Sequence, residues 1–197
     1  YEPKLLAIEN EEDSAGFYTG TPEEYSEELE LGCSIAHQED AEYKPLKKYK
    51  CTNGGMTSAD VSFLVWYDYL EKDESEKACS FAKRALYIRD RESNGEVYCL
   101  YDSVEKVPQW IKNLVSRLKR LIDVYKNSDI DYVNFHWYSH DPEALREVID
   151  YLEDKTGKQV ITNELGQKEW EAEAKYVQPL MQAIVDAGLE HAVWFSI

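Results

Sequence analysis

The stretch Gly157-Lys158-Gln159-Val160-Ile161-Thr162-Asn163-Glu164-Leu165-Gly166 determines which fold we expect for this chain. A glycine such as Gly157 is typical of the end of a helix, and the β-branched run that follows it is typical of a buried strand. Glu164 then stands before a turn that Gly166 closes. The pattern predicts a parallel strand that presents a carboxylate at its C-terminal end.

The rest of the chain repeats this alternation of helix and strand. Strands are predicted at 4–8, 49–52, 131–138, 160–164 and 191–197, and helices at 21–37, 58–70, 73–86, 108–125, 141–157 and 171–188. Several strands are continuously apolar, which favours a parallel sheet covered by helices. Residues 54–129 are more than one strand–helix unit needs, so we expect extra helices there. Neither GxGxxG nor a P-loop occurs, which disfavours a nucleotide-binding sheet.

Local signals support several of these helices. Thr21 followed by Pro22 and Glu24 has the form of a capping box, Asp141-Pro142 has the form of a helix start, and Ser58 is a candidate cap. The glycine pair Gly54-Gly55 predicts a loop where the backbone needs freedom or close approach. Apolar residues recur at helical spacing in the helix at 108–125: Trp110, Leu114, Leu118, Leu121, Ile122 and Tyr125.

The charge balance excludes some classes of partner. The formal net charge is −17, with 39 acidic against 22 basic residues, and phosphate binding needs a basic surface. We therefore expect neither nucleic acid nor an anionic membrane as a partner, and we see no transmembrane run. The 15 tyrosines and 5 tryptophans would suit stacking on sugar faces, although tyrosines that simply fill the core are an equal alternative.

The four cysteines, Cys33, Cys51, Cys79 and Cys99, are widely spaced. Without a CxxC motif or a nearby histidine pair, a zinc site is not expected. Cys51 lies in an apolar, strand-like context, which predicts a buried thiol. The disulfide state and the compartment, secreted or cytoplasmic, stay open. Since the sequence starts with Tyr1 and not Met, we expect that an upstream segment was removed or left out.

Two carboxylates, Glu11 and Glu164, follow predicted strands that are far apart in the sequence. In a parallel barrel, the C-terminal ends of such strands converge on one active-site face. Cleavage of a glycoside with retention needs one carboxylic acid to protonate the leaving oxygen and one carboxylate to attack the anomeric carbon. Spacing alone does not establish such a pair. Glu11 within 9–13 also fits a solvated acidic segment, and Glu164 also fits a surface turn.

Five motifs, in order, resemble the large clan of retaining glycoside hydrolases with (β/α)8 barrels. Ile8-Glu9-Asn10-Glu11 looks like the Asn-Glu motif that closes the fourth strand, and 162–166 (Thr-Asn-Glu-Leu-Gly) is similar to the Thr-Glu-Phe-Gly pattern that closes the seventh. Asn53-Gly54-Gly55 resembles the loop after the fifth strand and His136-Trp137-Tyr138 the end of the sixth. Trp194 lies where the eighth strand often carries a tryptophan.

The resemblance implies a role for each matching residue. Glu11 is expected to be the general acid/base and Glu164 the nucleophile, with Tyr138 or His136 hydrogen-bonded to Glu164. The implied substrate-binding residues are Asn10 at the sugar 2-hydroxyl, Trp194 as a stacking platform, and Asn53, His136, Trp137 and Tyr138. His136 is also expected as a structural histidine rather than a general base. No cofactor and no metal are implied.

The same resemblance implies that residues 1–197 form one portion of a catalytic barrel, strands four to eight, with extra helices between strands five and six. Strands one to three are missing from it, so we expect them from the same protein, a separate chain or a dimer mate. The expected function is retaining hydrolysis of a polysaccharide or oligosaccharide. The alternatives are a non-catalytic carbohydrate-binding or scaffolding module, and a barrel fragment that is inactive without its complement.

Overall fold

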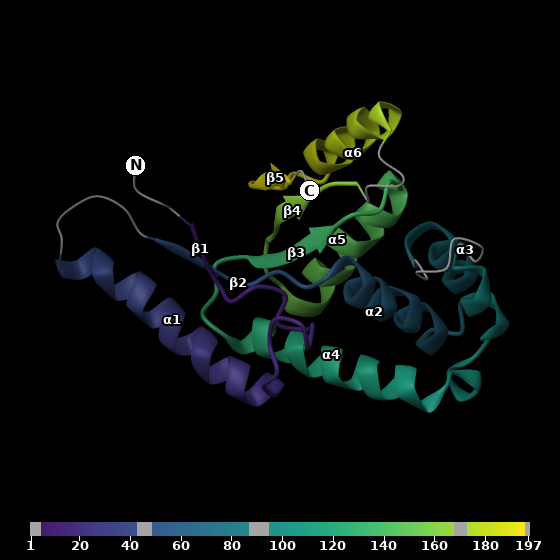
Figure 1. Ribbon diagram of the computed structural model, residues 1–197, viewed down its shortest axis with the longest axis horizontal. Coiled ribbons are helices and arrows are strands. Elements are labelled where there is room, and N and C mark those ends of the chain that lie inside the picture. Colours follow the sequence, from purple (N-terminus) through teal and green to yellow (C-terminus); the bar gives the residue numbers. More distant parts are fainter. Residues whose placement is uncertain (1–4, 43–48, 87–94, 168–172, 196–197) are drawn as a thin grey trace.

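Five parallel strands run through the computed structural model, which describes residues 5–42, 49–86, 95–167 and 173–195 (Figure 1). The strands are β1 (Leu5–Ile8), β2 (Lys50–Asn53), β3 (Val133–Trp137), β4 (Val160–Leu165) and β5 (Ala192–Trp194). The predicted strands at 4–8 and 191–197 extend into residues outside the described ranges. The other three lie where the sequence predicted them, within a few residues.

The strands pair in the order in which they occur along the chain. β1 pairs with β2, β3 with β4, and β4 with β5, all in parallel. Two isolated parallel bridges, Thr52 to Tyr132 and Met56 to Phe135, join the segments of β2 and β3. The predicted mixed α/β class with parallel strands is therefore confirmed.

Six α-helices connect the strands in the described part of the chain. They are α1 (Pro22–Glu42), α2 (Ser58–Glu71), α3 (Ser75–Ala85), α4 (Gln109–Asn127), α5 (Pro142–Thr156) and α6 (Ala174–Asp186), with short 3₁₀ helices η1 (Glu96–Leu100) and η2 (Val104–Lys106). Three of the α-helices lie between β2 and β3, where extra helices were predicted. The predicted start of α6 at residue 171 lies outside the described ranges. None of the described helices is long and apolar enough to cross a membrane.

Hydrogen bonds at the helix ends show why these helices begin where they do. In α1 the capping box forms, because the Glu24 amide donates to Thr21 Oγ1 at 3.1 Å and the Thr21 amide donates to the Glu24 carboxylate at 2.7 Å. Asp141 caps α5 by accepting from the Ala144 amide at 2.7 Å. The cap of α2 is Thr57 and not Ser58 as predicted, which leaves the Ser58 hydroxyl available for contacts with β3.

The core lies between the sheet and its helices. In α4, one stripe of apolar side chains faces this core. The buried residues of α4 are Ile111, Val115, Leu118, Leu121, Ile122 and Tyr125. Trp110 was predicted to share this stripe, but it is 60% exposed. Ile111 takes the buried position one residue further on, and Trp110 lies edge-on to the Phe63 ring, 6.4 Å between centroids.

Two disulfides join elements that the sequence places apart. Cys33 of α1 is bonded to Cys51 of β2, and Cys79 of α3 is bonded to Cys99 of η1. The prediction that Cys51 is buried is confirmed, since it has no exposed surface, but the prediction of a free thiol is wrong. The packing of α1 against β2 brings the two sulfur atoms together. Such disulfides are typical of proteins that fold in an oxidising compartment.

Candidate active site

The polar residues at the C-terminal ends of β1 to β4 gather at one edge of the sheet. Glu11 follows β1, the glycine pair follows β2, His136 lies near the end of β3, and Glu164 lies near the end of β4. Because the strands are parallel, these ends face the same way, and ligands of parallel sheets bind at such an edge. Residues that are more than 100 positions apart therefore meet.

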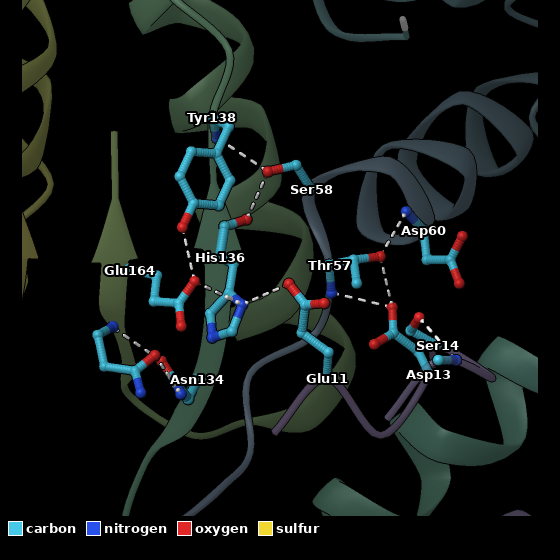
Figure 2. A network of polar contacts seen from close by, with 12 residues as sticks. Glu11, Asp13, Ser14, Thr57, Ser58, Asp60, Asn134, His136, Tyr138 and Glu164 are labelled. Carbon is cyan, nitrogen blue, oxygen red and sulfur yellow. Dashed lines mark hydrogen bonds and ion pairs between the residues drawn. The ribbon is translucent and has the colours of Figure 1, made fainter. Parts of the chain in front are cut away.

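Glu11 and Glu164 lie on either side of the His136 ring, as Figure 2 shows. His136 Nδ1 lies 2.9 Å from Glu11 Oε1 and 3.4 Å from Glu164 Oε2. The ring nitrogen and one oxygen from each carboxylate are all within 4.8 Å of one another. The structure thus brings together the two carboxylates that were predicted to act as a pair.

His136 is buried between these carboxylates, and its environment favours a positive charge. Two acceptors face Nδ1, so this nitrogen carries a proton. Burial lowers the pKa of His136, but the hydrogen bond with Glu11 and the charges of Glu164 and Glu11 outweigh burial, and the pKa is raised. The Nδ1–H group of His136 therefore bridges the two carboxyl groups.

Tyr138 holds the second carboxylate from the other side. Its hydroxyl donates to Glu164 Oε2 at 2.6 Å, and burial together with this contact raises the pKa of the phenol. The Ser58 hydroxyl donates to the His136 carbonyl at 3.0 Å and accepts from the Tyr138 amide at 2.8 Å (Figure 2). Ser58 thus fixes the end of β3 that carries both site residues. The sequence suggested only a helix cap for it.

Gly55 leaves the room that the His136 ring occupies. Its φ is +107°, which L-residues rarely adopt, and a Cβ there would collide with Nε2 and Cδ2 of His136. The prediction that the glycine pair serves close approach is confirmed at this position. His136 is accordingly enclosed by Gly55 on one side and by the carboxylates on the other.

The other predicted substrate-binding residues occupy different positions. Asn53 is fully buried, and its side-chain amide bonds to Glu12 and to the backbone of Asn134. Trp137 is also fully buried, because neighbouring strand residues point to opposite faces and His136 takes the site face. Neither side chain has exposed surface in the described structure, so the role of each in substrate binding stays a prediction.

Two predicted substrate-binding residues keep exposed surface. Asn10 is half-buried beside Glu11. Trp194, at the end of β5, is 36% exposed. Within the described residues neither side chain has a hydrogen bond or ring contact assigned to it, so both remain predictions as sugar-binding groups.

Beneath Glu11 lie acidic side chains that are buried rather than solvated. Glu12 has no exposed surface, and its Oε1 accepts from Asn53 Nδ2 at 2.8 Å and from the Tyr125 hydroxyl at 2.5 Å. Asp13 accepts from the amide and the hydroxyl of Thr57 at 2.9 and 2.7 Å. The segment around Glu11 is therefore fixed to α2 and α4, and the alternative of a solvated acidic segment does not fit it.

Several carboxyl groups in and next to this segment have raised pKa values. Burial, and next the charge of Asp13, raise the pKa of Glu12 to about 7, although the hydrogen bonds from Tyr125 and Asn53 oppose the shift. Burial and the neighbouring Asp13 carboxylate also raise the pKa of Asp60. Burial likewise raises the pKa of Asp13, because a charged carboxylate loses its hydration there.

Glu12→Gln is expected to increase stability at neutral pH. The unfolded chain releases the Glu12 proton near pH 4.5, whereas the folded chain keeps it to about pH 7. Stability from this group is present below pH 4.5 and is lost as the pH rises to 7, by about 3 kcal/mol. Gln keeps the neutral shape, so urea unfolding should show the variant gaining on the wild type between pH 4.5 and 7.

The exposed Glu30 on α1 provides the matched control for this measurement. Glu30→Gln removes the same charge without changing a buried group. If Glu12→Gln followed the pH profile of Glu30→Gln, the Glu12 carboxyl would not be protonated in the folded chain.

Among the described residues, Glu11, His136 and Glu164 also form a group that could hold a metal ion, since each offers one ligand atom. A nitrogen with two carboxylate oxygens suits a borderline cation such as Zn²⁺. Glycoside hydrolases generally use a pair of carboxyl groups directly. A cation bound by Glu11 and Glu164 would therefore occupy the carboxylates that are expected to act on a sugar.

Comparison with known protein families identifies a match over much of the chain. The family described as glycosyl hydrolase catalytic core matches residues 66–192, more than half of the chain. The matched region includes His136, Tyr138 and Glu164, whereas Glu11 lies outside it. Neither the curated proteins nor the solved structures contained a match. The chain therefore belongs to the glycosyl hydrolase catalytic core family, and the expected class, a glycoside hydrolase, is supported.

Proposed function

We propose that this protein cleaves O-glycosidic bonds with retention of configuration, with Glu11 as the acid/base and Glu164 as the nucleophile. One observation carries the proposal: oxygens of the two carboxylates lie within 4.8 Å of each other, on either side of His136 Nδ1. Retaining enzymes hold their carboxyl groups about 5–5.5 Å apart, whereas inverting enzymes need roughly 6.5–9.5 Å to admit a water. The short separation favours retention.

The reaction would take place in two displacements. In the first, an oxygen of Glu164 bonds to the anomeric carbon while the glycosidic C–O bond breaks, and the Glu11 proton passes to the leaving oxygen. In the second, Glu11 removes a proton from water, the water oxygen bonds to the anomeric carbon, and the bond to Glu164 breaks. Both carboxyl groups end in the states in which they began.

The hydrogen bonds of the site support this division of roles. Tyr138 and His136 both contact Oε2 of Glu164, which fixes the carboxylate and leaves Oε1 for attack. For Glu11, the corresponding partner among the described residues is His136. A nucleophile benefits from a fixed orientation, whereas a general acid must release and regain its proton within one cycle.

The substrate class we propose is a polysaccharide or oligosaccharide. Trp194 has an exposed face at the end of β5, and an apolar ring suits the C–H-rich face of a sugar. Asn10, next to Glu11, has a side-chain amide that would bind the sugar 2-hydroxyl.

A mechanism-based label tests the proposal. The chain is incubated with a panel of 2-deoxy-2-fluoro glycosides that carry activated leaving groups, and the peptides are analysed by mass spectrometry. A glycosyl adduct on the peptide that carries Glu164 is expected, at one sugar per chain. An adduct on another carboxylate would overturn the assignment, and turnover of the parent glycosides without any adduct would contradict a covalent intermediate.

We also propose that the sheet continues beyond β1 and β5, as in a closed (β/α)8 barrel. In the described part of the chain, β1 pairs only with β2 and β5 only with β4. Apolar side chains next to the β5 edge are exposed, with Val193 at 52% and Phe195 at 42%. Open edges with apolar surface associate readily. The complement would be strands from the same protein, a separate chain or a dimer mate.

If this is right, residues 1–197 alone should self-associate as their concentration rises, and Val193→Lys should weaken the association because it places a charge beside the edge. Light scattering coupled to size-exclusion chromatography measures this. Leu100→Lys, at an exposed apolar position on η1, is the matched control. A wild-type chain that stays monomeric at high concentration would count against an open edge.

A further inference from the structure

At the site, β4 has one extra residue relative to each of the strands that pair with it, β3 and β5. Asn134 pairs with Ile161 and His136 with Glu164, so two positions on β3 correspond to three on β4. Thr162 pairs with Ala192 and Leu165 with Trp194, so two positions on β5 likewise correspond to three on β4. Asn163 is the residue that both mismatches share. The strand therefore has a β-bulge at Asn163.

The bulge decides which way Glu164 points. Asn134 and His136 are two residues apart and share the site face of β3, and their partners Ile161 and Glu164 share that face on β4. Ile161 and Glu164 are three residues apart, a spacing that puts side chains on opposite faces of a regular strand. In a regular strand Asn163 would face the site and Glu164 would face the helices.

Asn134 holds the bulge in place through two reciprocal hydrogen bonds. The Asn163 amide donates to Asn134 Oδ1 at 3.0 Å, and Asn134 Nδ2 donates to Asn163 Oδ1 at 2.8 Å. The Thr162 hydroxyl spans the same bulge by donating to the Glu164 carbonyl at 3.1 Å. Asn134 is fully buried, so losing these bonds would leave polar groups unsatisfied.

Asn134 is in turn fixed by Asn53, whose Oδ1 accepts from the Asn134 amide at 2.7 Å and whose Nδ2 donates to the Asn134 carbonyl at 2.9 Å. The same Nδ2 donates to Glu12 at 2.8 Å. Asn53, Asn134 and Asn163, here called the asparagine ladder, thus connect β2, β3 and β4. At one end of the ladder, Asn53 bonds to Glu12, which follows Glu11 in the chain. At the other end, Asn163 directly precedes Glu164.

We infer that the asparagine ladder positions the two carboxylates, with Asn163 and its bulge turning Glu164 toward Glu11. The inference rests on the proposed function, since the separation of the carboxylates matters only for that chemistry. The three asparagines act from beneath the site through backbone and side-chain bonds. A displacement of about 1 Å of a reacting group can cost about 10²-fold in rate.

The test replaces Asn163 with Ala, which keeps the backbone amide but removes the acceptor for Asn134 Nδ2. With an activated aryl glycoside that the wild type hydrolyses, kcat is expected to fall about 10²-fold while KM changes less than about 3-fold. The pKa of His136, followed by NMR of its ring, should fall in the same variant, because the Glu164 charge moves away. Asn163→Ser, whose hydroxyl accepts from Asn134, should recover much of both.

Asn127→Ala is the matched control, because Asn127 lies exposed on α4 and its side chain donates to the backbone carbonyl of Asp123 in the same helix. A purely structural role for Asn163 would lower the melting temperature while leaving kcat per folded molecule and the His136 pKa at control values, and that result would overturn the inference. A wild type without turnover, combined with a lowered His136 pKa in Asn163→Ala, would overturn the proposed function and leave the positioning role standing.

Discussion

Glu164→Ala is expected to lower kcat/KM by at least about 10⁴-fold, since removing a covalent nucleophile leaves only binding and the remaining polar groups to act. Glu164 is only partly buried and the aromatic partner Tyr138 stays in place, so the variant should fold. Initial rates on aryl glycosides, with enzyme concentration from the folded fraction, give the measurement.

Adding azide to the Glu164→Ala variant gives a more specific test of the nucleophile. The methyl group of Ala leaves space beside His136 where a small anion fits, and azide can attack the anomeric carbon in place of the carboxylate. The product should be a glycosyl azide of inverted configuration, because only one displacement occurs. Glu30→Ala on the exposed face of α1 should keep wild-type rates. Should Glu164→Ala retain a tenth or more of the activity, Glu164 would not be the nucleophile.

Replacing Glu11 with Ala should produce a loss that depends on the leaving group. General acid catalysis contributes about 10²–10⁴-fold, and we expect that loss with poor leaving groups such as another sugar. A nitrophenolate leaving group needs no proton, so the first displacement should stay fast while the second becomes slow. Stopped-flow traces should then show a burst, and the alkaline limb of the pH profile should disappear.

Azide again separates the possibilities, because it needs no general base and should accelerate the second displacement in Glu11→Ala. The glycosyl azide formed should keep the substrate configuration, the opposite of the result with Glu164→Ala. Equal losses for good and poor leaving groups would contradict the acid/base role. Glu9, which precedes the site and is exposed, offers the neighbouring control Glu9→Ala.

The sequence predicted the order of the elements because that order follows from local patterns. Alternating apolar strands and amphipathic helices, the capping box at Thr21 and Glu24 and the helix end at Gly157 all depend on residues within one or two turns. The two carboxylates could be named for the same reason, since each follows a short strand. Their meeting at His136 required the parallel sheet.

Other parts of the site could not be predicted from local patterns. Asn53 and Trp137 appeared to be substrate-binding residues, yet the sheet buries both. The bulge at Asn163 is invisible without the partner strands, because it is defined by register and not by composition. The disulfide between Cys51 and Cys33 could not be predicted either, because it depends on the packing of α1 against β2.

By itself the sequence determined the class of fold, the succession of strands and helices, and the two acidic residues suited to glycoside cleavage. Tertiary structure alone decided that these residues face each other, that Glu12 is buried with a raised pKa, and that three asparagines connect β2, β3 and β4 beneath them. The physical reason is the distance along the chain over which each interaction acts. Helix caps and apolar periodicity act between neighbours in the chain, whereas register, burial and pKa shifts depend on which distant segments come to lie alongside one another.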